Sequence, residues 1–156
     1  MAEPFTPTDE LASPHVAWSE LACRDGTAYP EAWRKDRLPV LLNCFEAVRE
    51  RCGGKPIRIL SAYRSPAHNA KVGGATHSQH VEGRALDLQP PAGVPLRAFW
   101  IIVKDLARTL PLRGLGFYAD AGFVHIDTRP STVTHIWRGG RPEAEVAGAK
   151  PHAIKG

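Results

Sequence analysis

Apolar side chains recur at helical spacing in two segments of the chain. Over residues 36–54 ("DRLPVLLNCFEAVRERCGG"), leucine, phenylalanine, valine and cysteine fall every three or four positions, the period that places them on one face of a helix. Asp36 stands where an N-cap belongs, and Gly53 is placed to end the helix. Residues 95–111 ("PLRAFWIIVKDLARTLP") repeat the pattern until Pro111 stops it. The sequence therefore predicts two long helices, each burying one face.

Five short runs with strand-like patterns lie between and after these helices. They are "IRILSAY", "RALDLQ", "RGLGFYA", "GFVHIDT" and "THIWRG", at 57–63, 84–89, 113–119, 122–128 and 134–139. Only short turns separate the last three. A helix, two strands, a helix and then a cluster of strands is typical of an α+β domain. We expect an antiparallel sheet of about four to five strands backed by helices.

The length and composition indicate one soluble domain. A chain of 156 residues, 43% of them apolar, can form one hydrophobic core without disulfides. We expect this domain over 14–139, between an N-terminal arm (1–13) and a flexible C-terminal tail (140–156). No apolar run approaches the roughly 18 to 20 residues that cross a bilayer, so we expect no membrane insertion. The acidic, Pro-rich start lacks the pattern of a secretory signal, which predicts synthesis in the cytoplasm.

Charge and cysteine content narrow the possible partners. The net charge of +4 is compatible with a polyanionic target, but the basic residues are scattered and no recognition helix is visible, so we expect no nucleic-acid partner. Cys23, Cys44 and Cys52 cannot all pair within one chain, and none stands in a Cys-x-x-Cys motif. We expect reduced thiols, with Cys44 and Cys52 packed on the first helix, and a monomer.

A candidate metal site comes from the polar faces of two predicted strands. Because side chains alternate along a strand, Asp87 of "RALDLQ" and His125 of "GFVHIDT" both lie opposite their apolar neighbours. His80 precedes Asp87 in "SQHVEGRALDL", and the three can converge if the strands are adjacent and the loop folds over them. Two imidazoles and a carboxylate suit a zinc ion with its fourth position open to water, whose pKa falls toward ~7.

The residues around His80 suit either a metal site or an ordinary turn. A histidine followed seven positions later by an aspartate arises often by chance, and a solvated turn before a strand is the plain alternative. Gly83 allows a tight turn between the two. Ser78 can hold the loop or the second nitrogen of the imidazole. The shared strand phase with His125 favours the metal site.

Two longer segments resemble the zinc D-Ala-D-Ala carboxypeptidase family. They read "SAYRSPAHNAKVGGATHSQHVEGRALDL" and "GLGFYADAGFVHIDTR", and the similarity covers about residues 14–130. That family is grouped with lysostaphin-type peptidases and the hedgehog signalling domain, and it includes small phage and bacterial enzymes that cut peptidoglycan stem peptides. The ordered set Ser-x-His-x-x-Gly-x-Ala-x-Asp, then Gly-Phe-Val-His, carries the resemblance. It implies a hedgehog-like fold, zinc as cofactor and His80, Asp87 and His125 as its ligands.

The same resemblance suggests catalytic groups. Arg64, in "SAYRS", becomes a candidate for neutralising a substrate carboxylate or the oxyanion that forms on attack, although an arginine at a strand end is often simply solvated. Many relatives carry an acidic general base three residues before the last histidine, where this chain has Gly122. The nearest upstream acid is Asp120, our candidate base. Asp127 is its rival, and can instead orient a ligand by sharing a face with His125.

His77 completes the candidate catalytic set. It stands three residues before His80, where it can donate a proton or bind the transition-state oxygen. The alternative is that His77 is a loop histidine without a role in catalysis. Tyr63 and Tyr118 flank strands that lead to the site and suit substrate contact.

The resemblance implies a zinc peptidase that hydrolyses peptidoglycan stem peptides or cross-links, as a D,D-carboxypeptidase or an endopeptidase. Such an enzyme would act on the cell wall after release or injection, as a phage lysis enzyme or a secreted one. The alternative is a non-catalytic zinc or cell-wall binding module of the same fold, which Gly122 keeps open.

Overall fold

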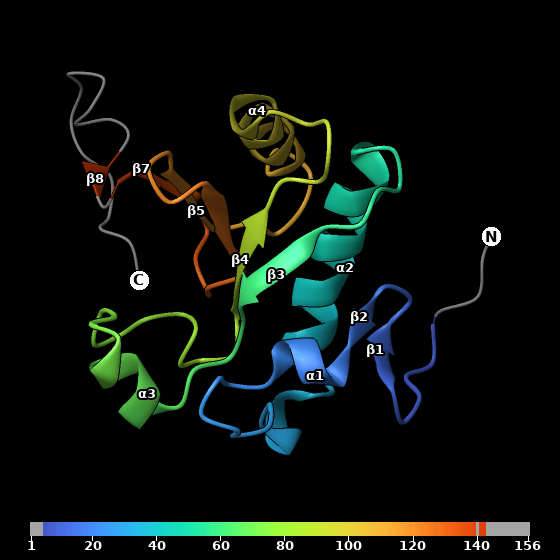
Figure 1. Cartoon of the computed structure of the whole chain (residues 1–156), viewed down its shortest axis with the longest axis vertical. Coiled ribbons are helices and arrows are strands. Elements are labelled where there is room, and N and C mark those ends of the chain that lie inside the picture. The colour runs from blue at the N-terminus through green and yellow to red at the C-terminus, as the bar shows by residue number, and fades with distance from the viewer. Residues whose placement is uncertain (1–4, 140, 143–156) are drawn as a thin grey trace.

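A sheet of six strands forms the centre of the part of the chain that the structure, a computed structural model, describes: residues 5–139 and 141–142 (Figure 1). The strand order is β3-β4-β6-β5-β7-β8. The strands are β3 (Arg58–Ser61), β4 (Ala85–Gln89), β5 (Gly114–Tyr118), β6 (Phe123–Asp127), β7 (His135–Arg138) and β8 (Arg141–Pro142). Each of the five predicted runs therefore contains a strand.

One pairing in this sheet departs from the expected antiparallel arrangement. β5 and β7 run parallel, with Gly114 opposite His135, whereas the other neighbours are antiparallel. The reason lies in the connection that follows β6. β6 ends at Asp127, which is opposite Gly114, the first residue of β5. The chain then passes the start of β5 and begins β7 on the other side of β5, so that β7 runs in the same direction as β5. The sheet is therefore mixed, and β8 adds a sixth strand.

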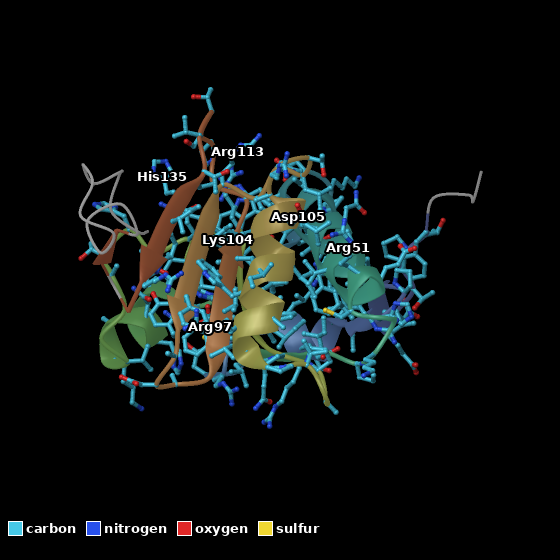
Figure 2. All side chains as sticks on the ribbon, turned by 90° about the horizontal axis from the view of Figure 1, so that it is seen from above. Arg51, Arg97, Lys104, Asp105, Arg113 and His135 are labelled. Atoms are coloured by element: carbon cyan, nitrogen blue, oxygen red, sulfur yellow. The ribbon has the colours of Figure 1, made fainter. Side chains whose placement is uncertain are left out.

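Two helices cover one face of the sheet, as the apolar periodicity predicts. α2 (Arg37–Arg51) is preceded by the N-cap residue Asp36, whose side chain accepts a hydrogen bond from the Arg37 N–H at 2.7 Å. α4 (Leu96–Leu106) ends five residues before Pro111. Figure 2 shows both on one side of the strands, with α3 (Pro66–Lys71) on the other. The labelled ion pair between Arg51 and Asp105 joins α2 to α4 at 2.9 Å; because it is exposed, it contributes little to stability.

The hydrophobic core lies between these helices and the sheet. Leu86 and Leu88 of β4, together with Val124 and Ile126 of β6, are fully buried. They belong to the same cluster as the aromatic side chains of α2 and α4, namely Phe45, Phe99 and Trp100. Because strand side chains alternate, this leaves Asp87 and His125 on the face that the two long helices do not cover. Core packing thus determines where the polar side chains gather.

Several short elements had no predicted counterpart. They are β1 (Leu11–Ser13), β2 (Val16–Ala17), α1 (Trp18–Leu21), the 3-10 turn η1 (Glu31–Trp33) and α3. β1 pairs with β2, and Ala12 belongs to the core, so the last three residues of the expected arm are ordered into a hairpin. Strands of two or three residues are too short to show alternation in a sequence. The expected tail falls on residues that lie outside the described ones, apart from Arg141–Pro142.

The three cysteines are unpaired and buried, and Cys44 and Cys52 belong to the core, as predicted. Among the described residues, no helix combines the length and apolar character needed to cross a bilayer.

Candidate metal centre

The three predicted ligands converge at the centre of the sheet. β4 and β6 are neighbours, and their register sets Asp87 directly opposite His125. The loop before β4 brings His80 over the same point. One ligand atom from each of the three residues lies within 4.8 Å of the other two, and all three side chains are buried. The arrangement expected from strand phase is therefore present in the folded chain.

His80 is held in one orientation by two contacts. Its Nδ1 lies 2.7 Å from the Ala62 carbonyl oxygen, which can only accept, so Nδ1 is the donor of this pair and Nε2 is the ring nitrogen that faces the centre. That Nε2 lies 3.1 Å from Asp87 Oδ1. The backbone N–H of His80 donates to Ser78 Oγ at 3.2 Å. Of the two roles considered for Ser78, holding the loop is therefore the one observed.

The turn between His80 and β4 requires the glycine at position 83. Gly83 has a φ of +69°, and a Cβ there would lie 2.6 Å from Trp33 Cε3. The Tyr29 hydroxyl donates to the Gly83 carbonyl at 2.6 Å. A larger residue would be strained and would also displace this packing.

His125 is oriented by a carboxylate from its own strand. Its Nδ1 lies 3.0 Å from Asp87 Oδ1, and its Nε2 lies 2.7 Å from Asp127 Oδ2. Arg129 donates to both oxygens of Asp127, from Nε at 2.9 Å and from Nη2 at 2.7 Å. A Cβ at Gly114 would collide with this carboxylate. Asp127 is fully buried and faces His125 and Arg129, which favours the orienting role over that of general base.

The charges around the ligands leave a place for a cation. Burial opposes the ionised form of Asp87, but attraction to His80 and hydrogen bonding with His125 outweigh it and hold the pKa of Asp87 well below its usual range. Burial also opposes the charged form of His125, yet hydrogen bonds with Asp127 and Asp87 raise its pKa to about 9. These carboxylates thus favour positive charge at the centre. A divalent cation bound there would be held by neutral imidazoles, and two imidazoles with one carboxylate suit zinc.

A cavity of about 290 Å³ gives solvent access to these three side chains. Arg64 and Tyr118 are among its lining residues. Arg64 Nη2 lies 3.5 Å from Asp87 Oδ2, and its Nε donates to Ser61 Oγ at 3.1 Å. The Tyr118 hydroxyl accepts a hydrogen bond from Trp137 Nε1 at 2.7 Å. The centre therefore has protein on the sheet side and space for a ligand on the other.

The candidate catalytic residues differ in how close they come to this cavity. Arg64 lines it, whereas Asp120 and His77 are not among its lining residues. Asp120 is exposed in the turn between β5 and β6, where it lines the neighbouring cavity together with Tyr118. His77 is exposed in the loop before His80. Gly122 has a φ of +77°, so the position at which the family resemblance implies an acid is a left-handed turn residue here.

Two residues that matter to the geometry were not predicted. Arg129 fixes Asp127, and Trp137 packs against the His125 ring with the ring centroids 5.1 Å apart. The "HIDTR" sequence contains a usable signal, because an arginine two positions after a buried aspartate can fold back onto its carboxylate. No local signal marks Trp137, because the parallel pairing of β7 with β5 brings it to the site.

These features define the class of protein. A buried His-Asp-His set beside an open cavity is an arrangement that can hold one metal ion with a coordination position open to solvent. The chain matches the Peptidase M15 family over residues 14–127, a range that includes all three candidate ligands, and it belongs to this family.

Three relatives show how far the similarity extends. The probable peptidoglycan L,D-endopeptidase MepK of Haemophilus influenzae is 38% identical over 88 residues, covering 53% of this chain and 43% of the relative. The peptidoglycan L,D-endopeptidase MepK of Escherichia coli K12 is 33% identical over 82 residues, covering 49% and 42%. The zinc D-Ala-D-Ala carboxypeptidase of Streptomyces albus G is 44% identical over 44 residues, covering 28% and 17%. The chain thus spans less than half the length of the curated relatives it matches.

Proposed function

We propose that the protein is a zinc-dependent peptidase that hydrolyses peptide bonds in peptidoglycan stem peptides or cross-links. The observation that carries this proposal is the buried set of His80, Asp87 and His125, which faces an open cavity. Membership of a peptidase family and the peptidoglycan-acting relatives support the reaction and the substrate class.

The ligand atoms for zinc are His80 Nε2, a carboxylate oxygen of Asp87 and His125 Nδ1. When bound, zinc supplies Lewis acidity, which activates a water molecule at neutral pH and polarises a carbonyl group. The protein fixes both imidazoles through the Ala62 carbonyl and Asp127. Arg64 presents its guanidinium to the same cavity, where it can neutralise charge that develops on the substrate carbonyl oxygen.

The proton of the attacking water needs an acceptor, and we propose Asp120 for this role. Asp127 is occupied by His125 and Arg129, while Asp120 stands in a turn that begins beside Tyr118, a residue of the metal cavity. The Asp120 carboxylate is exposed and lines the cavity that adjoins the metal cavity at Tyr118. His77 is retained as a proton donor to the leaving amine, since the loop before His80 is also exposed.

Replacement of Asp120 by asparagine is expected to lower kcat about a hundredfold, the lower end of general base contributions, with zinc content unchanged. Steady-state kinetics and metal analysis on the same preparation measure both quantities. His77→Gln is the matched comparison. Full activity in Asp120→Asn, combined with a large loss in His77→Gln, would move the base role to the histidine.

The cavities beside the centre support cleavage within a chain rather than only at its end. Arg64 connects the metal cavity to a second one of about 240 Å³, and Tyr118 connects it to a third of about 360 Å³. Peptide on both sides of the scissile bond therefore has space. We propose endopeptidase action, in keeping with the names of the two MepK relatives.

Digestion of purified muropeptides is the direct test of the proposed function. We expect zinc-loaded protein to release products that mass spectrometry assigns to one peptide bond, and we expect a chelator to abolish release until zinc is restored. An internal cut in a cross-linked dimer identifies an endopeptidase, whereas loss of one terminal residue identifies a carboxypeptidase. Zinc binding without any cleavage would contradict the proposal and leave a binding module.

We further propose that the protein acts as a monomer at the cell wall. All three ligands and Arg64 come from one chain, so the site is complete without a second copy. The location at the cell wall follows from the proposed substrate, peptidoglycan.

A further inference from the structure

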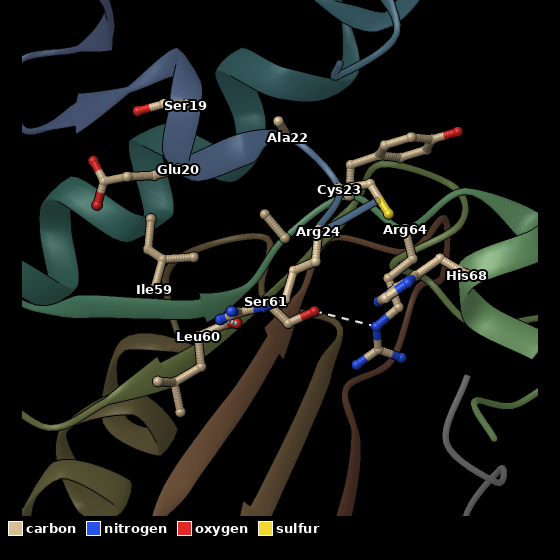
Figure 3. A pocket seen from close by; sticks show the side chains of 12 residues that line it. Ser19, Glu20, Ala22, Cys23, Arg24, Ile59, Leu60, Ser61, Arg64 and His68 are labelled. Atoms are coloured by element: carbon tan, nitrogen blue, oxygen red, sulfur yellow. Dashed lines mark hydrogen bonds between the residues drawn. The ribbon is translucent and has the colours of Figure 1, made fainter. Parts of the chain in front are cut away.

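A second cavity adjoins the metal cavity at Arg64 and is lined by two arginines and a histidine. It is lined by Arg24, Arg64 and His68, together with residues at the end of β3 (Figure 3). Arg64 is the only one of the three considered in the catalytic site above. Glu20 also lines this cavity, but its carboxylate accepts from the Ala17 N–H at 2.8 Å, and Figure 3 shows it far from Arg64 and His68.

Both guanidinium groups are fixed to consecutive residues of β3. Arg24 Nη2 donates to the Leu60 carbonyl at 2.7 Å, and Arg64 Nε donates to Ser61 Oγ at 3.1 Å. Within the described part of the chain, Arg24 forms no ion pair with a carboxylate, whereas Arg64 contacts Asp87. A guanidinium has five N–H donors, so Arg24 retains most of its hydrogen-bonding capacity after it binds one carbonyl.

The loop that carries Arg24 is held in place on either side of it. The Ser65 N–H donates to Cys23 Sγ at 3.4 Å, and the Ser65 hydroxyl donates to Asp25 Oδ2 at 2.5 Å. Ser65 also caps α3 by accepting from the His68 N–H at 3.1 Å. One serine therefore ties the Arg24 loop to the helix that bears His68. In Figure 3 the His68 side chain reaches from α3 toward Arg64.

We infer that this cavity, which we call the cationic subsite (Arg24, Arg64 and His68), binds a free carboxylate of the substrate peptide on one side of the scissile bond. The inference rests on the proposed function, because Arg64 links the subsite to the metal cavity. A planar guanidinium matches a carboxylate and forms strong, charge-assisted hydrogen bonds with it. A primary carboxamide has nearly the same shape but no charge, and its NH₂ group would face donors.

A pair of cross-linked muropeptides that differ only at this group, free carboxylate or carboxamide, tests the inference. We expect zinc-loaded protein to cleave the carboxylate form with a kcat/KM at least about tenfold higher, which corresponds to about 1.4 kcal/mol. The difference should lie in KM, because a contact away from the reacting bond acts on ground state and transition state alike. In Arg24→Gln and in His68→Gln, the ratio of kcat/KM for the carboxylate form to that for the carboxamide form should fall below about threefold.

Arg108→Gln is the matched control for charge, since Arg108 is an exposed arginine beyond the end of α4 and outside the subsite. It should retain the full ratio. Equal cleavage of both muropeptides by the unaltered protein would overturn the inference and leave the proposed function intact. The same conclusion would follow if the ratio of kcat/KM between the two muropeptides stayed unchanged in both Arg24→Gln and His68→Gln.

A binding measurement separates the two proposals if neither muropeptide is cleaved. Calorimetric titration of the same pair into the protein should show tighter binding of the carboxylate form, and Arg24→Gln should remove the difference. The proposed function would then fail and the cationic subsite would stand. Equal affinities, or no binding of either form, would overturn the subsite.

Discussion

Replacement of His125 by alanine is expected to abolish peptidase activity, with a loss of at least about a thousandfold in kcat/KM. The physical reason is the loss of the metal rather than of a proton carrier. Removing one imidazole leaves only two protein ligands, and three are needed to hold a catalytic zinc ion with one position open. Activity on muropeptides and zinc content of the purified protein should fall together.

The same substitution should leave most of the fold intact. The side chain points away from the core formed by Val124 and Ile126, so the apolar packing between sheet and helices is retained. The circular dichroism spectrum, measured on chelated protein, should therefore change little. The urea midpoint should fall, because the buried carboxylates of Asp87 and Asp127 lose the imidazole that hydrogen-bonds with both. His15→Ala, in the hairpin of β1 and β2, removes a partly exposed imidazole that pairs with Glu46 and should retain both zinc and activity. A His125→Ala protein that kept its zinc and its activity would refute the assigned ligand set.

Periodicity in the sequence was sufficient to predict the elements that form the core. The two helices and five strands have long or strongly patterned apolar runs, and the alternation in β4 and β6 correctly placed Asp87 and His125 on one face. Asp36 was predicted as an N-cap for the same local reason and accepts from the Arg37 N–H. Such features depend on neighbours within a few residues, which a sequence shows directly.

The supporting contacts could not be predicted in the same way, because they join distant segments. The Ala62 carbonyl that orients His80 lies 18 residues before it, and Trp137 reaches His125 only through the parallel pairing of β7 with β5. No motif spacing marks His68 or Arg24, which are 44 residues apart in the sequence and line one cavity in the fold, where Ser65 contacts both segments. Strand phase thus placed Asp87 and His125 on one face, whereas the position of His80 over them and the groups that orient all three side chains required the fold.

Replacement of Arg64 by lysine is expected to lower kcat by about a hundredfold to a thousandfold. This is the usual cost of removing one hydrogen-bond donor to a developing oxyanion. Lysine keeps the positive charge but lacks the planar fork that contacts Ser61, Asn69 and Asp87 together. Activity would then depend on a single flexible ammonium group. Steady-state kinetics on a muropeptide substrate give the loss, and zinc analysis confirms that the ligands are undisturbed.

The division of this loss between kcat and KM decides which role Arg64 has. A fall in kcat at constant KM assigns it to charge that appears only in the transition state. A rise in KM at constant kcat assigns it to a substrate carboxylate, which would make it one wall of the cationic subsite and no more. Arg108→Gln should change neither constant. If Arg64→Lys retained full activity, both roles would be refuted, and the Arg64 side chain would serve only to connect β3, Asn69 and Asp87 in the folded chain.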